Sequence, residues 1–258
     1  MPFAQSGELR THYEFTGDQG PVLVFSNSLG TNFSMWDPQM AELRQRFRIL
    51  RYDTRGHGQS SVTAGDYTIE QLGRDVVGLL DTLKLDRVHF CGLSMGGVIG
   101  LWLGIHAPGR LDRLVLSNTG ARIGTQEMWN ARIATVQKDG MKPVAAAVIE
   151  RWFTPEFRAS CPDQVAKAQG MLESTPPAGY SACCAAIRDV DLRDSLAQIK
   201  TPTMILYGAK DPVTPPADAE FLRKRIHGSA KMELEAAHLS NVEQPEDFTE
   251  AVNHFLSK

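Results

Sequence analysis

A serine bracketed by glycines constrains the fold of this chain more than any other feature. Residues 92–96 read Gly-Leu-Ser-Met-Gly, between an apolar strand-like run at 88–91 and an apolar helical stretch at 98–105. In a G-x-S-x-G nucleophile elbow the serine occupies a strained strand-to-helix turn and presents its hydroxyl at the top of a sheet. A Cβ at either glycine would crowd such a turn. The pattern predicts Ser94 as a nucleophile. The alternative, a Gly/Ser-rich linker, would leave the partners described below unexplained.

Strand-like and helix-like segments alternate on both sides of this turn. Expected strands cover residues 9–16, 22–25, 48–53, 88–91, 111–118, 201–208 and 231–235. Expected helices cover residues 33–46, 68–83, 98–105, 218–226 and 245–256, with Thr68 or Asp66 capping the second. The run 22–25 is apolar throughout, as in a strand buried on both faces of a parallel sheet. The fold class is therefore α/β, with a mostly parallel central sheet and helices on both faces.

The alternation stops in the middle of the chain. From residue 122 to residue 196 the sequence is helical in composition, is interrupted by prolines and contains no strand-like run. We therefore expect a helical cap at 122–196 that lies over the carboxyl edge of the sheet. The core domain then consists of residues 1–121 and 197–258, which leaves enough apolar sequence for one large core.

Charge and cysteine usage exclude several classes of function. The formal net charge is −3 with scattered Lys and Arg, which is no footprint for nucleic acid. No apolar segment approaches the roughly 20 residues of a membrane span, and the first residues do not resemble a secretory signal. The four cysteines form no C-x-x-C pair, which argues against a disulfide framework or a zinc site. We expect a cytoplasmic protein that binds neither nucleic acid nor membrane.

Two further residues are candidate partners of the serine. A serine hydroxyl becomes nucleophilic when a neighbouring base takes its proton, and a third group fixes the tautomer of that base. Asp211 and His238 each follow an expected strand, so both lie at the edge of the sheet that carries Ser94. Alone, Asp211 could open a turn before a proline and His238 could be a solvated loop residue. Together they predict a catalytic triad. His57, in a glycine loop, is expected to have a structural role in a turn.

The reaction also needs N–H donors for the oxyanion that develops during attack. One predicted donor is the backbone N–H of Met95, at the N-terminus of the helix after the serine. The other should come from the loop after the strand 22–25. Within that loop we select Leu29, with Ser28 or Gly30 as alternatives.

Candidate substrate-binding residues lie in the expected cap. Trp129 and Arg132 are three residues apart and share one helix face, and Trp152 follows in the next helical stretch. An arginine beside aromatic rings suits a small planar substrate that carries an anionic group. The alternative is that the cap arginines are solvated surface residues.

These residues carry a resemblance to the α/β-hydrolase superfamily over nearly the whole chain, including the order Ser, Asp, His. More narrowly, the chain resembles the 3-oxoadipate enol-lactonases of bacterial aromatic catabolism. The similarity rests on the segments 25–31 (FSNSLGT), 51–58 (RYDTRGHG), 90–97 (FCGLSMGG) and 238–245 (HLSNVEQP). The first is the most telling, because most relatives have His-Gly where this chain has Asn27 and Ser28.

The resemblance implies hydrolysis of 3-oxoadipate enol-lactone, a small anionic lactone, to 3-oxoadipate in the β-ketoadipate pathway. It implies an acyl-enzyme on Ser94 and no metal or organic cofactor. The nearest alternative is a carboxylesterase or carbon–carbon bond hydrolase of the same fold. A lactone-binding signalling receptor with little turnover and a non-catalytic scaffold are further alternatives. The sequence leaves the oligomeric state open, a homo-oligomer included.

Overall fold

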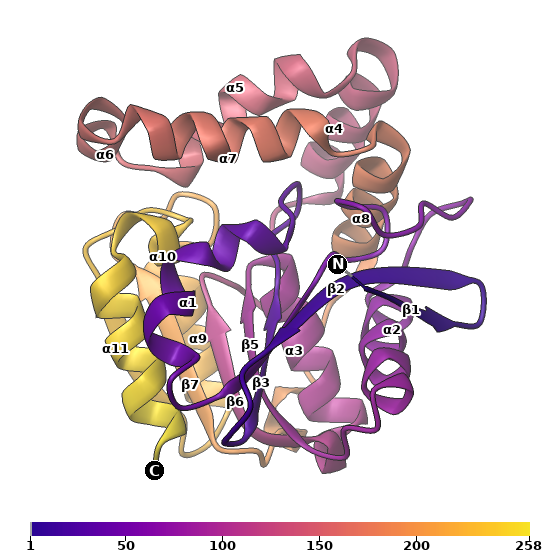
Figure 1. Ribbon diagram of the computed structural model, residues 1–258. Helices are drawn as coiled ribbons and strands as arrows, with labels where there is room; N and C mark the ends of the chain where they lie inside the picture. The colour runs from indigo at the N-terminus through magenta and orange to yellow at the C-terminus, as the bar shows by residue number, and fades with distance from the viewer. Residues whose placement is uncertain (1) are drawn as a thin grey trace.

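A single eight-stranded sheet forms the centre of the computed structural model, which describes residues 2–258 (Figure 1). The strands lie in the order β1-β2-β4-β3-β5-β6-β7-β8. Their bounds are β1 Phe3–Ser6, β2 Leu9–Thr16, β3 Val22–Ser26, β4 Arg48–Tyr52, β5 Val88–Leu93, β6 Leu111–Ser117, β7 Thr203–Gly208 and β8 Ala230–Leu234. All neighbours from β4 to β8 pair in parallel, whereas β2 pairs antiparallel with both β1 and β4. The predicted α/β class and its mostly parallel sheet are confirmed.

The two strands next to the nucleophile turn are buried on both faces. Every residue of β3 and of β5 is buried, as the uninterrupted apolar run in β3 predicts. Strand β1 does not appear among the sequence predictions. It has only four residues and pairs with one neighbour at the edge of the sheet, so no alternation of useful length precedes the turn at Gly7.

Helices cover both faces of the sheet, with α1 and α11 packed together on one side and α2 and α3 on the other (Figure 1). The core helices are α1 Asp37–Leu43, α2 Ile69–Thr82, α3 Met95–His106, α9 Pro216–Arg225, α10 Ser240–Glu243 and α11 Pro245–Leu256, with 3-10 turns η1 Phe33–Trp36, η2 Pro108–Arg110 and η3 Leu196–Gln198. Thr68 is the N-cap of α2, because its Oγ1 accepts the Gln71 N–H at 3.0 Å.

The prediction of a single helix over residues 33–46 is wrong. The segment forms η1 followed by the separate, shorter helix α1. A continuous α-helix would need an N–H at position 38, and Pro38 has none. Asp37 instead donates its N–H to the Ser34 carbonyl and closes the 3-10 turn. The helix α1 then begins with proline in its first turn, where no intrahelical donor is required.

Helices α4 to α8 lie above the carboxyl ends of the strands (Figure 1). Their bounds are α4 Gln126–Asp139, α5 Met141–Trp152, α6 Pro155–Ser160, α7 Pro162–Ser174 and α8 Pro177–Asp189. Helix α4 packs on α8, and α5 packs on α7. All of them fall within the predicted cap at 122–196, and the division of the chain into core and cap stays a prediction. Across the described part of the chain, no helix combines the length and apolarity of a membrane span.

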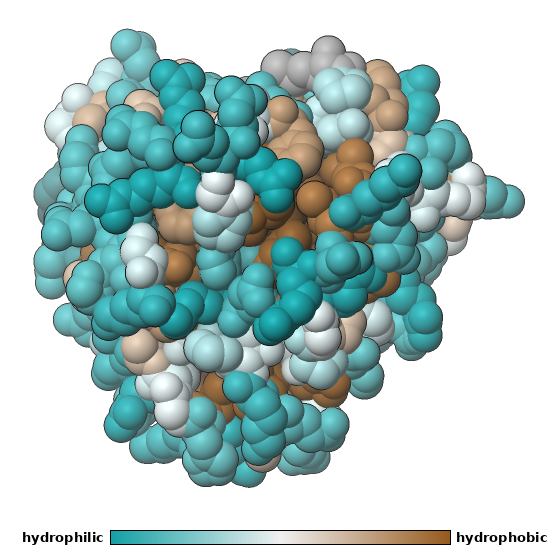
Figure 2. All heavy atoms as spheres, turned by 60° about the horizontal axis from the view of Figure 1, so that its bottom comes forward, coloured by the Kyte–Doolittle hydropathy of each residue, from teal (hydrophilic) through white to brown (hydrophobic). Residues whose placement is uncertain are grey.

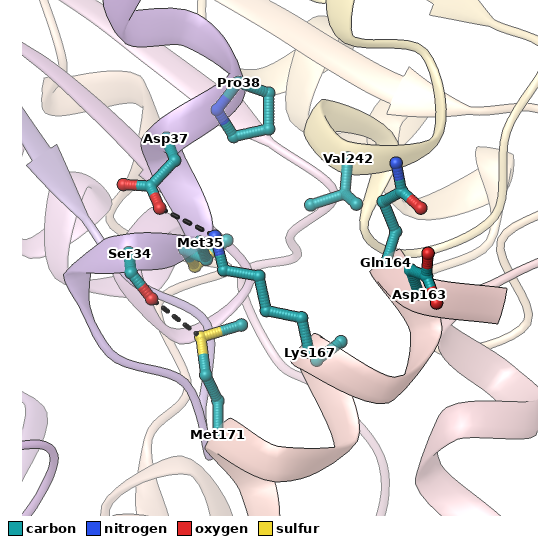
Figure 3. Close-up of a pocket in the computed structure, with 10 residues that line it drawn as sticks. Ser34, Met35, Asp37, Pro38, Asp163, Gln164, Lys167, Met171 and Val242 are labelled. Carbon is teal, nitrogen blue, oxygen red and sulfur yellow. Dashed lines mark hydrogen bonds and ion pairs between the residues drawn. The ribbon is translucent and has the colours of Figure 1, made fainter. Parts of the chain in front are cut away.

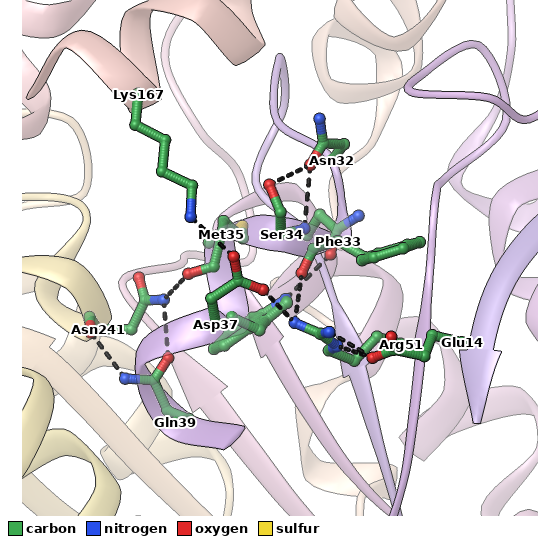
Figure 4. A network of polar contacts seen from close by, with 12 residues as sticks. Glu14, Asn32, Phe33, Ser34, Met35, Asp37, Gln39, Arg51, Lys167 and Asn241 are labelled. Carbon is green, nitrogen blue, oxygen red and sulfur yellow. Dashed lines mark hydrogen bonds and ion pairs between the residues drawn. The ribbon is translucent and has the colours of Figure 1, made fainter. Parts of the chain in front are cut away.

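An ion-pair network joins α7 to α1 and β4 beside a surface cavity (Figures 3 and 4). Lys167 of α7 donates to Asp37 at 2.7 Å, and Arg51 of β4 pairs with both Asp37 and Glu14. The cavity, about 360 Å³, separates η1 and α1 from α7. None of its lining residues is a predicted site residue, so we assign this region to cap attachment.

Few large apolar side chains remain outside the core. Figure 2 shows the lower side of the molecule as oriented in Figure 1, where mostly hydrophilic side chains surround a central hydrophobic group. Among residues 2–258, the exposed large hydrophobic side chains are Phe3, Val62 and Met232. A few exposed apolar side chains of this kind are normal on a protein surface.

Candidate active site

Ser94 occupies the turn between β5 and α3 in a conformation that few residues adopt. Its φ is 57° and its ψ is −115°, whereas side-chain-bearing residues seldom have positive φ. A Cβ on Gly92 would lie 2.1 Å from the Gly96 carbonyl oxygen, and a Cβ on Gly96 would lie 2.1 Å from that of Ser26. The two glycines are therefore required by close backbone approaches. The geometry is that expected of a nucleophile elbow.

The structure brings the other two predicted triad residues into contact. His238 Nδ1 lies 2.8 Å from Asp211 Oδ2, and both side chains are buried. Ser94 and His238 line the same cavity. Because Asp211 occupies Nδ1, Nε2 is the ring nitrogen of His238 left to act as a base. The arrangement can therefore support nucleophilic acyl transfer.

Asp211 is held ionised by a shell of donors. Burial opposes its ionisation, but His238, Asn118 and Thr214 outweigh that effect and lower the pKa of Asp211 to about 2. The backbone N–H groups of Val213 and Thr214 bind the other carboxylate oxygen at 2.7 and 3.1 Å. The carboxylate thus stays charged at neutral pH and keeps His238 in the tautomer with a proton on Nδ1.

Asn118, directly after β6, was missed in the sequence. Its Nδ2 donates to Asp211 Oδ2 at 3.0 Å and to the Ala237 carbonyl at 3.1 Å. Its φ of 42° is one of few positive values outside glycine, and asparagine tolerates that region better than most residues. The only signal was position, because Asn118 follows a strand at the same sheet edge as Ser94.

Glu243 of α10, also missed, ties the histidine loop to the cap. One carboxylate oxygen accepts the Ala237 N–H at 2.9 Å, and the other accepts the N–H and hydroxyl of Thr154, between α5 and α6. A second link runs from the Leu239 N–H to the Trp152 carbonyl at 3.0 Å. Nothing local in the sequence marks Glu243 for this role.

The two predicted oxyanion donors are unpaired within residues 2–258. Neither the Leu29 N–H nor the Met95 N–H has a hydrogen-bond partner there. The flanking amides all donate elsewhere: Ser28 to Met35 Sδ (3.4 Å), Gly30 to His57 Nε2 (2.9 Å), Ser94 to the Ser117 carbonyl (2.9 Å) and Gly96 to the Asn27 carbonyl (3.0 Å). This favours Leu29 over the alternatives Ser28 and Gly30, and the assignment of both donors stays a prediction.

The cavity above the triad is small and continues outward. About 30 Å³ lies beside Ser94 and His238, and about 190 Å³ lies next to it between α4, α5 and the loop after β7. Both spaces are lined by all three predicted cap residues, Trp129, Arg132 and Trp152. Trp129 is fixed by a 2.7 Å bond from its Nε1 to the Ile123 carbonyl.

Two arginines give this outer space an excess of positive charge. Arg132 and Arg151 both line it, and no carboxylate oxygen of the described chain lies within 4.0 Å of either guanidinium. Arg132 lies over the Trp129 ring, 5.0 Å from its centroid. Burial and then the charge of Arg132 lower the pKa of Arg151. A bound anion would relieve this repulsion.

A second carboxyl group near the triad has the opposite character to Asp211. Burial and then the charge of Asp211 raise the pKa of Asp218, on α9, to about 6. Since the unfolded chain releases this proton near 3.8, stability from Asp218 is complete below that pH and is lost as the pH rises through 6. We expect Asp218→Asn to stabilise the protein by on the order of 1 kcal/mol at pH 8, allowing for its partial exposure. Chemical denaturation at pH 8 and pH 4 checks this, because the gain should disappear at pH 4.

Comparison with known proteins places this geometry among characterised folds. Residues 21–245 match the family described as alpha/beta hydrolase fold. The chain is 45% identical to 3-oxoadipate enol-lactonase 2 of Acinetobacter baylyi, over 92% of this chain and 89% of that protein. It is 41% identical to 3-oxoadipate enol-lactonase 1 of the same organism, over 93% and 90%. The crystal structure of the enol-lactonase from Burkholderia xenovorans superposes with a TM-score of 0.98 at 43% identity, covering all of both chains.

Proposed function

We propose, since this chain belongs to the α/β-hydrolase family and within it to the 3-oxoadipate enol-lactonases, that it hydrolyses 3-oxoadipate enol-lactone to 3-oxoadipate in aromatic catabolism. The observation that carries the substrate assignment is the pair Arg132 and Arg151. Both lie beside the cavity that contains Ser94 and His238, and neither has a carboxylate partner in the part of the chain that the structure describes. The carboxylate of the lactone would bind there while its ring enters the inner space.

The proposed reaction has two halves. In the first, Ser94 Oγ attacks the lactone carbonyl while His238 Nε2 takes the hydroxyl proton, and the Leu29 and Met95 N–H groups bind the oxyanion. The ring C–O bond then breaks, and His238 returns the proton to the enol oxygen. The enol stays attached through the acyl group and becomes a ketone. In the second half, His238 takes a proton from water, which attacks the ester carbonyl. The bond to Ser94 Oγ then breaks, His238 returns the proton to that oxygen, and 3-oxoadipate is released.

The cellular setting follows from the same chemistry. The four cysteines are all unpaired, and three of them are buried. Reduced thiols are characteristic of a cytoplasm. We therefore place the enzyme there, as a protein whose partner is a small anionic lactone.

The test is steady-state hydrolysis of the enol-lactone beside a neutral ester such as p-nitrophenyl acetate. Arg132→Ala should lower kcat/KM for the lactone by about 10- to 100-fold, the value of one hydrogen bond to a charged group, with little change for the ester. Arg151→Ala should act in the same direction. Arg193→Ala, which removes an arginine paired with Asp191 outside the cavity, is the matched control.

Two results would contradict the proposal. Equal or better activity of the wild type on the neutral ester would move the protein to the carboxylesterases or carbon–carbon bond hydrolases of this fold. A lactone that binds but is turned over only once would favour the alternative of a lactone-binding signalling receptor. Rapid multiple turnover excludes the receptor.

A further inference from the structure

His57 lies in a buried turn after β4 and contacts the oxyanion loop rather than the triad. Its side chain is fully buried. The turn is closed by bonds from the His57 N–H to the Thr54 carbonyl at 2.9 Å and from the Ser60 N–H to the His57 carbonyl at 3.1 Å. These bonds agree with the structural role expected from the sequence. The ring, however, makes a contact that a turn does not require.

The ring of His57 accepts a hydrogen bond from the loop that carries Leu29. The Gly30 N–H donates to His57 Nε2 at 2.9 Å, and Nδ1 lies 3.3 Å from the Arg55 carbonyl oxygen. Nδ1 must carry the proton to donate to that carbonyl, which leaves Nε2 as an acceptor. The two contacts therefore require the same neutral tautomer. Burial lowers the pKa of His57 to about 4, so this form persists at neutral pH even though Asp53 and the Cys183 thiol lie nearby.

The bond acts on the peptide that sets the shape of the oxyanion loop. The Thr31 N–H donates to the Ser28 carbonyl at 3.2 Å, which closes a turn over residues 28–31. The φ of Gly30 is +80°, whereas the φ of Leu29 is not positive. This combination defines a type II turn. The peptide between Leu29 and Gly30 rotates when such a turn converts to type I. The His57 ring holds the N–H of that peptide in place.

Helix α8 packs against the turn that carries the His57 ring and limits its movement. A Cβ on Gly179 of α8 would lie 2.1 Å from the Gly56 carbonyl oxygen, so backbone meets backbone there. The Cys183 Sγ, one turn further along α8, lies 3.6 Å from the Arg55 carbonyl oxygen and 4.0 Å from His57 Nδ1. The turn that holds His57 is therefore pressed between the cap and the oxyanion loop. It cannot shift without moving α8.

We propose that His57 is a positioning residue that holds the Leu29 N–H toward the oxyanion through its bond to the Gly30 N–H. The proposal rests on the proposed function only in taking Ser94 as the nucleophile, and it applies to any ester that Ser94 attacks. Because the effect is confined to the transition state, loss of the acceptor lowers kcat and leaves KM unchanged.

The test compares three side chains at this position. His57→Gln keeps an acceptor that reaches the Gly30 N–H, His57→Asn keeps the same amide one methylene too short, and His57→Leu fills the volume without an acceptor. Removing an oxyanion donor costs about 10²- to 10³-fold in kcat, so misplacing one should cost about 10- to 100-fold. We expect that loss for Leu and Asn, with partial recovery for Gln. Active sites are counted with a serine-reactive fluorophosphonate, so that unfolded protein does not enter kcat.

Inhibition by phenylboronic acid, which forms a tetrahedral adduct on a catalytic serine, provides a second readout. Its affinity should fall in parallel with kcat across the series, while KM stays constant. Equal kcat for Gln and Asn, or a loss that appears only in KM or melting temperature, would overturn the proposal. The Gln and Asn pair decides the matter if the Leu variant fails to fold. If the wild type prefers p-nitrophenyl acetate, the enol-lactonase assignment fails, and the same series on that ester still tests His57.

Discussion

Ser94→Ala is expected to lower kcat for the enol-lactone by about 10⁴- to 10⁶-fold, because the covalent route is lost and only binding and the oxyanion donors remain. The fold should survive the change. Within residues 2–258, Ser94 Oγ makes no hydrogen bond, and alanine keeps the Cβ that the positive-φ turn already accommodates. Activity of freshly purified protein, together with the melting temperature, checks both parts.

Ser28→Ala is the matched control for this variant. Ser28 lines the same cavity as Ser94, and its hydroxyl also lacks a hydrogen-bond partner in the described chain. It should therefore retain most of the activity. Substantial turnover by Ser94→Ala with loss of activity in Ser28→Ala would show that the nucleophile has been misassigned.

The elbow could be predicted because its causes are local. Gly92 and Gly96 are required because a Cβ on either would lie 2.1 Å from a backbone carbonyl oxygen, and such requirements show in a single pentapeptide. The sheet edge could be predicted because parallel strands bring the residues that follow each of them to one side. That rule places Asp211 and His238 near Ser94 without knowledge of any side-chain rotamer. Pro38 was a readable signal as well, since it excludes the continuous helix first expected there.

The supporting residues could not be predicted, because their causes are distant in sequence. Asn118 contacts Asp211 only because β6 and β7 are neighbours in the sheet, and the two residues lie 93 positions apart. Glu243 joins a helix of four residues to a cap turn 89 positions away. For His57, local reasoning identified a turn but had no access to its contact with Gly30. Each of these contacts depends on how helices, strands and turns that are distant in sequence pack against one another.

Asp211→Asn is expected to lower kcat by about 10⁴-fold, because every group around this carboxylate is a donor. Oδ2 accepts from His238, Asn118 and the Thr214 hydroxyl, and Oδ1 accepts from the Val213 and Thr214 amides. An asparagine amide placed toward Oδ2 would face Asn118 Nδ2, which cannot accept. His238 would then be driven to the tautomer with its proton on Nε2, where it cannot take the proton of Ser94.

The stability of the Asp211→Asn variant should also differ from that of the wild type in a way that depends on pH and identifies Asp211 as the group responsible. The pKa of Asp211 is about 2 in the folded protein, below its ordinary value of 3.8, so its charge contributes about 2 kcal/mol to stability above pH 4. This contribution is lost as the pH falls through 2. The unfolding free energy of Asp211→Asn should lie below that of the wild type at pH 7 by about this amount, with the gap narrowing toward pH 3. Asp218→Asn, the neighbouring carboxyl, should keep its activity and change stability in the opposite direction. If both substitutions reduced kcat alike, the loss would reflect general negative charge at this edge, and the tautomer argument for Asp211 would fail.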